Sequence, residues 1–192
     1  MKHFLVLLTL MTNVCVADAM KGFGARYYDK DTEHYSDTYR TDKDLIPNIV
    51  IGSNTYKMES STLINIATDT DVEVNKDNQA NWICLKSQGV NYWFISDNEI
   101  GGGDLTTIAI AKDGSDCIPF EDKINVSIKN TPLLAMSKKK ISSYFSHEPV
   151  KDIVMYYKEV KTTDEYTQGN SIQYFLKGEH VQGLFISQGT TN

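Results

Sequence analysis

The chain has 192 residues, with 25 Asp and Glu against 19 Lys and Arg, which gives a net charge of −6 at neutral pH. This acidic balance argues against nucleic acid as a partner, because phosphate groups are bound by Lys and Arg. The length suits one hydrophobic core or two lobes of about 75 residues each.

Residues 1–19 have the pattern of a secretory signal peptide. Lys2 gives a short positive start, residues 4–10 are apolar apart from Thr9, and Ala17-Asp18-Ala19 fits a small-x-small cleavage site. The apolar run is too short to span a membrane, and no later run approaches that length. A buried N-terminal element is the alternative. We expect cleavage after Ala19 and a soluble product in the periplasm of a Gram-negative envelope or outside the cell.

The three cysteines predict one disulfide. Cleavage after Ala19 removes Cys15, and bulky Val14 stands where a lipid-anchored protein would carry a small residue. Cys84 and Cys117 are then expected to pair in an oxidising compartment. A thiolate pair that binds metal is the alternative, but neither a CxxC motif nor a nearby His supports it.

Residues 20–47 are polar and contain scattered tyrosines, without a period of 2 or 3.6. We interpret them as an arm that is partly disordered unless it packs on the body.

Residues 48–120 predict a first α+β lobe. Two short strands, 48–51 and 55–58, flank turn residues and form a hairpin. A helix over 62–67 follows, with Ser60-Ser61 as its cap. Val72 and Val74 alternate with acids, as in a solvated strand. Three stronger strands are expected at 82–86, 91–96 and 105–111.

Residues 121–192 repeat this order. A strand over 123–129 precedes a helix over 138–145, which Ser137 caps and which Ile141 and Phe145 make apolar on one stripe. Three strands follow at 152–160, 171–177 and 181–187. We therefore expect an α+β fold of two similar lobes, each a short helix packed on an antiparallel sheet of three to four strands. One continuous sheet is the alternative.

The second half resembles a known fold. "LLAMSKKKISSYFSHEPVKDIVMYYKE" and "IQYFLKGEHVQGLFIS", within residues 133–187, are similar to the domain of BamE/SmpA-type envelope proteins and of the β-lactamase inhibitor protein fold. The shared features are the helix start at Met136-Ser137, Pro149 after the helix, and the hairpin connection at 177–181. Ala135 and Ser146 replace two glycines of that pattern. The resemblance implies a helix layer against an antiparallel sheet, with a free sheet face for binding protein, and a possible repeat in residues 48–117.

No motif for catalysis or metal binding stands out. His34, His147 and His180 are far apart, and Lys151 breaks the HExxH pattern after His147-Glu148. The acids Asp69, Asp71 and Glu73 have the spacing of calcium ligands, but the loop lacks its glycine and its last ligand. No GxSxG surrounds a serine. We expect no enzyme activity, no metal and no cofactor.

Aromatic residues on the predicted strands point to protein binding instead. A helix covers one face of a sheet, so some rings should lie on the other face, where they are typical of protein interfaces. The candidate partner-binding residues are Trp82, Tyr92, Trp93, Tyr156 and Tyr174. Packing of these rings as core between the lobes is the alternative.

The predicted function is that of an exported, non-enzymatic protein-binding protein. An inhibitor or immunity protein that blocks a secreted toxin or a cell-wall hydrolase is the leading version. A BamE-like accessory of envelope assembly is the alternative. The sequence identifies neither the partner nor the oligomeric state.

Overall fold

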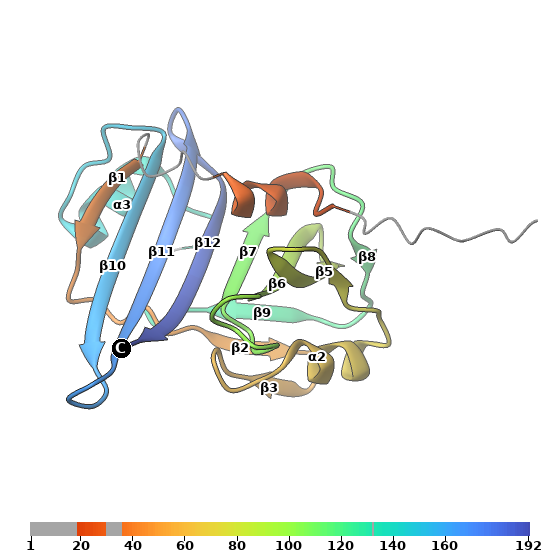
Figure 1. Cartoon of the computed structure of the whole chain (residues 1–192). Coiled ribbons are helices and arrows are strands. Elements are labelled where there is room, and N and C mark those ends of the chain that lie inside the picture. The colour runs from red at the N-terminus through yellow and green to blue at the C-terminus, as the bar shows by residue number, and fades with distance from the viewer. Residues whose placement is uncertain (1–18, 30–35, 132) are drawn as a thin grey trace, which may run out of the picture.

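The computed structural model describes residues 19–29, 36–131 and 133–192 of the chain. These residues are mostly β-structure, and nine strands form one large mixed sheet (Figure 1). The strands are β1 (Ser36–Arg40), β4 (Asn75–Lys76), β5 (Ala80–Ser87), β6 (Val90–Asp97), β7 (Thr107–Ala111), β8 (Ile118–Pro119), β10 (Ile153–Lys161), β11 (Thr167–Lys177) and β12 (His180–Thr191). Their order is β1-β10-β11-β12-β7-β6-β5-β4, and β8 lies beside β5.

Two antiparallel meanders, β5-β6-β7 and β10-β11-β12, make up most of this sheet. They join through their last strands, because β7 pairs antiparallel with β12 and sets Ile108 opposite Ile186 and Ile110 opposite Leu184. The predicted fold of two lobes, each with its own small sheet, is therefore wrong. The physical reason is β7 itself: every residue from Thr107 to Ala111 is buried, as in an interior strand covered on both faces.

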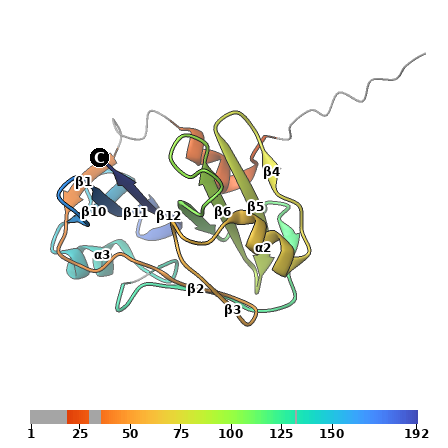
Figure 2. The same ribbon diagram turned by 60° about the horizontal axis from the view of Figure 1, so that its bottom comes forward.

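A second layer packs against one face of the large sheet, as Figure 2 shows. It contains a small sheet of β3 (Asn54–Tyr56), β2 (Asn48–Ile51) and β9 (Ile124–Ser127), together with the helices α2 (Leu63–Thr70) and α3 (Lys138–Phe145). The main core lies between the layers and runs through both halves of the chain, since Ile83, Phe94 and Ile108 share it with Ile172 and Leu184. We call this the core face of the large sheet.

Local sequence explains where the helices begin and end. Thr62, not the predicted Ser60-Ser61, caps α2. Its Oγ1 accepts the backbone N–H of Asn65, and the Asn65 Oδ1 in turn accepts the backbone N–H of Thr62. Ser137 caps α3 as predicted, and the predicted bounds of α3 are confirmed. Asp71 and Ser146 end the two helices in the left-handed conformation.

The opposite face of the large sheet is partly covered by the 3₁₀ helix η1 (Gly22–Tyr28). Figure 1 shows it lying across one end of β7 and β12. Part of the predicted polar arm thus packs on the body, and residues 36–40 of the same arm form the edge strand β1.

Candidate protein-binding surface

The predicted partner-binding rings are largely covered in the structure. Tyr156 and Tyr174 belong to the main core and are fully buried, and Tyr92 is half-buried against the same core. Trp82 and Trp93 point to the opposite face, as strand alternation predicts, but they are also buried. The expected open aromatic face is therefore not open at these positions, and none of the four buried rings is accessible to a partner in this conformation.

Residues 20–28 cover Trp82 and Trp93, and we call them the N-terminal cover. Phe23 packs on Phe185 and Phe175 with ring centroids 5.3 and 5.2 Å apart, and on Trp93 at 6.3 Å. Gly24 lies so close to Trp93 that an added Cβ would be 2.5 Å from the indole Cδ1. This close approach requires glycine, and it seals Trp93 from solvent.

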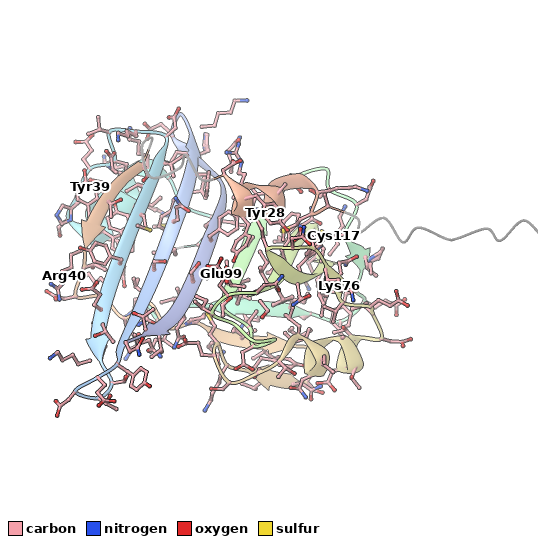
Figure 3. All side chains as sticks on the ribbon, viewed as in Figure 1. Tyr28, Tyr39, Arg40, Lys76, Glu99 and Cys117 are labelled. Atoms are coloured by element: carbon pink, nitrogen blue, oxygen red, sulfur yellow. A yellow bond between two sulfur atoms is a disulfide. The ribbon has the colours of Figure 1, made fainter. Side chains whose placement is uncertain are left out.

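Three carboxylates anchor the N-terminal cover to the sheet. The Tyr27 hydroxyl donates to Asp97 at 2.5 Å, the Tyr28 hydroxyl donates to Asp77, and the Phe23 backbone N–H donates to Asp113 at 2.8 Å. Figure 3 shows the side chain of Tyr28 within this region. Burial and the acceptor carboxylates raise the pKa of both tyrosines, so both hydroxyls stay protonated as donors at neutral pH.

Asp113 is the best-connected of these carboxylates. Burial by itself favours its neutral form, but hydrogen bonds from Ser115, from Asn91 and from the Phe23 backbone outweigh burial and lower the pKa of the Asp113 carboxyl. The Asn91 side-chain amide donates to it at 2.6 Å. Asp113 is therefore a structural acceptor, with its oxygens already engaged.

A cavity of about 570 Å³ opens beside the disulfide. Its walls include Trp82, Trp93, Asp113 and both cysteines, and the Cys84–Cys117 disulfide is present as predicted. No histidine lines this cavity among the described residues, and its cysteines are paired.

The histidines of the described chain do not form a site. His147 stacks on Tyr39 with centroids 4.5 Å apart, and His180 lies exposed at the start of β12. His34 lies outside the described residues. In the part of the chain that the structure describes, no group of three His, Cys, Asp or Glu side chains could hold a metal ion.

The described residues leave the remaining part of this sheet face open, and we call it the platform. It consists of the outward residues of three strands, all partly exposed: Met155 and Tyr157 of β10, Gly169, Ser171 and Gln173 of β11, and Ser187 and Gly189 of β12. In Figure 1 no helix or strand lies in front of these strands. Buried residues alternate with all of them, so a period of 2 in the sequence marks this face, although none of these residues was predicted to bind a partner.

Small residues keep the floor of the platform low. Tyr157, Ser171 and Ser187 are in register across the three strands, and Gly169 pairs with Gly189 beside them. Ile100, from the β6–β7 loop, reaches over Gly189, where an added Cβ would lie 3.2 Å from its Cδ1. Ile100 remains 59% exposed and borders the platform with an apolar side chain.

Charged residues stand at the borders of the platform rather than at its centre. Arg40 of β1 lies on the side of the outer edge, and Glu99 of the β6–β7 loop lies on the side of β12 (Figure 3). The centre is formed by a thioether, a phenol, an amide and hydroxyls. An uncharged centre with a charged rim is the usual composition of a protein interface.

Among the residues described, no helix combines the length and the apolar character that crossing a membrane requires. The chain matches no protein-family model, no curated protein and no solved structure.

Proposed function

We propose that this chain is an exported, non-enzymatic protein that binds and inhibits another protein, such as a secreted toxin or a cell-wall hydrolase. The observation that carries the proposal is the platform: a sheet face of three long strands that the described residues leave uncovered, while the N-terminal cover closes the rest of the same face. A sheet face that serves only stability is normally covered or strongly polar.

The shape of the platform favours a protein over a small molecule. A small ligand is usually held in a concave pocket that surrounds most of its surface. The platform instead offers a broad floor, with Met155 and Tyr157 as the larger side chains and serines and glycines between them. Tyr157 is the best candidate for an anchor residue, because a tyrosine buries a large area at a small cost in rotamer entropy.

Export is part of the proposal. Met20 is 4% exposed and packs in the same buried cluster as Phe23 and Trp93, whereas Ala19 is exposed. Cleavage between them would leave the whole cover on the mature protein. N-terminal sequencing of the processed chain should therefore begin at Met20, and an intact residue 1 or a lipid on Cys15 would contradict export by this route.

The binding function is tested with the full mature chain. It should capture a protein from periplasmic or culture fluid, and the purified pair should show the enzymatic or toxic activity of the partner suppressed. Replacing Tyr157 by Ala should weaken the pair by about 2 kcal/mol, and placing a bulky charge by Ser171→Arg should abolish it. Tyr166→Ala is the matched control, since Tyr166 is an exposed tyrosine in the β10–β11 loop.

The outcomes separate the candidates. A captured hydrolase or toxin that is inhibited supports the proposal, whereas a captured component of envelope assembly that keeps its activity supports the accessory role instead. Equal effects of the Tyr157 and Tyr166 variants would remove the platform from the interface.

A further inference from the structure

The outer side of α2 carries an apolar groove. It has a volume of about 480 Å³, and its lining is Ile64, Ala67, Thr68, Asp71, Val72, Glu73 and Val74. Ile64 is 71% exposed, although Leu63 and Ile66 of the same helix are buried in the core. A large aliphatic side chain held in solvent beside two half-buried valines is an apolar contact area that no described residue covers.

The rim of this groove is acidic, and its charge is not compensated. Asp71 and Glu73 are exposed, and no hydrogen bond or ion pair joins either carboxylate to a described side chain. Asp69, two residues before Asp71, accepts the Tyr56 hydroxyl at 2.5 Å. The groove lining contains no Lys, Arg or His.

The position of these acids on the helix makes them unfavourable in the free protein. The C-terminal end of a helix carries partial negative charge, so cations stabilise it and anions destabilise it. The last turn of α2 has no basic residue, and Asp71 is its C-cap. A cation brought by another molecule would therefore interact with the helix end and with both carboxylates together.

The surrounding chain has the same sign. Residues 48–120 contain ten acidic residues and only four lysines, so most of the net negative charge of the protein belongs to this half. The long-range field favours approach of a basic partner and disfavours an anionic membrane surface.

We propose that the groove along α2 docks a basic segment of a partner protein, with one aliphatic side chain of that segment packed between Ile64 and the valines. The proposal rests on the proposed function only in taking the partner to be a protein. α2 packs on the core face of the large sheet, whereas the platform is on the opposite face, so the two surfaces are separable by mutation.

The test uses purified mature chain and synthetic peptides, so it does not depend on finding the natural partner. The probe is an arginine-rich peptide with a central leucine, and amide chemical shifts should move over residues 63–74 on titration. A peptide with glycine in place of the leucine, and one with glutamates in place of the arginines, should each bind at least about fivefold more weakly.

Two variants and one control make the result decisive. Ile64→Ser, and the pair Asp71→Asn with Glu73→Gln, should each reduce peptide affinity about fivefold to tenfold. Neither should lower the unfolding midpoint, because all three side chains are outside the core, and the pair should raise it slightly, because it removes negative charge from the C-terminal end of α2. The pair Glu121→Gln with Asp122→Asn removes the same charge from another exposed site and should leave affinity unchanged.

Equal weakening by the control pair would show that only overall acidity attracts the peptide, and would overturn the proposal. Shifts spread outside α2, or a glycine peptide that binds as well as the leucine peptide, would do the same. Inhibition of a natural partner through the platform is measured separately, so failure of the groove leaves the proposed function standing, and failure of the platform leaves the groove standing.

Discussion

Trp93 illustrates how a single residue can be placed by segments that are distant in the sequence. Its indole is 1% exposed because Phe23 packs on it and the backbone of Gly24 touches it. Strand alternation sets the face of the sheet on which Trp93 lies. It does not determine whether that face is exposed to solvent. The contribution of Trp93 is therefore to stability in the free protein.

Trp93→Ala should lower the free energy of unfolding by about 3 kcal/mol or more, because it removes a large buried side chain and leaves a cavity under the N-terminal cover. Tyr157→Ala should cost less than about 1 kcal/mol, because Tyr157 lies on the platform, outside the core, and is partly exposed. Urea unfolding of both variants measures the difference. A stable Trp93→Ala protein would mean that the cover is not seated in solution.

The sequence indicates on which face of a sheet a strand residue lies, but it does not indicate whether that face is covered. Tyr92 and Trp93 lie on opposite faces of the sheet, as strand alternation requires, because the period of a strand is fixed by its backbone. Burial of these rings was the alternative to an open face, but the segment that covers Trp82 and Trp93 was not predicted, because residues 20–28 show no periodicity that marks them as a cover. Phe23 was the available signal: a lone large ring followed by glycine.

At the scale of elements, the N-terminal cover depends on ionised carboxylates. Hydrogen bonds that favour the charged form lower the pKa of Asp77 and of Asp113 below its ordinary value, although burial opposes the shift. A carboxyl with a lowered pKa in the folded state adds stability above its unfolded value of about 3.9, and this stability is lost as the pH falls through the folded value.

The cover should therefore loosen in acid. The contribution of Asp113 to the free energy of unfolding should be constant between about pH 5 and pH 7. Below about pH 4 this contribution should decrease, because the carboxylate becomes protonated. Asp113→Asn should be less stable than the parent at neutral pH and should lose less on acidification, as measured by urea unfolding at several pH values. Asp116→Asn, an exposed neighbour, is the control and should keep the parent's pH dependence. An unchanged profile for Asp113→Asn would contradict the role of this carboxylate.

The disulfide links β5 to the segment before β8 across 33 positions of sequence. Reduction should lower the free energy of unfolding by about 3 to 4 kcal/mol, since a ring of this size restricts the unfolded chain. Unfolding with and without dithiothreitol measures the change, and a Cys84→Ala, Cys117→Ala double variant should not respond to the reductant. Two free thiols in the unreduced, unfolded protein would refute the bond in solution.

Elements with strong local signals were predictable, and those made by distant pairing were not. α3 has a cap at Ser137 and an apolar stripe through Ile141 and Phe145, and both are properties of a short stretch of chain. β1 exists only because residues 36–40 pair in parallel with β10, more than a hundred residues later. The Val72–Val74 segment does not form the predicted strand, and β4 begins only at Asn75.

At the scale of the whole molecule, the join between β7 and β12 decides the architecture. Each meander in isolation would leave an apolar edge strand unpaired, with the interior residues of β7 exposed along one side. Because β7 and β12 pair with each other, neither half of the chain leaves this edge strand unpaired. The repeated order of elements is compatible with two lobes or with one sheet, and only the uninterrupted burial of "TIAIA" at 107–111 distinguishes the two.

The full chain should therefore unfold in one transition, with tryptophan fluorescence and far-ultraviolet circular dichroism giving the same midpoint. Residues 20–120 and residues 121–192, expressed separately, should each lack dispersed amide resonances, because the main core and the large sheet cross the boundary between them. Two separate transitions, or a folded fragment, would contradict a single cooperative unit.

Because Phe23 packs on Phe175 and Phe185, these contacts of the N-terminal cover can form only late in the synthesis of the chain. Phe23 is synthesised near the start of the chain, whereas Phe175 and Phe185 are synthesised only with β11 and β12, the last two strands. Contacts of such high sequence separation form slowly, since a long loop must close before any contact is gained. A chain whose beginning and end must meet cannot complete its fold until its synthesis ends. Export machinery that threads extended polypeptide, as proposed above for this chain, requires such a delay.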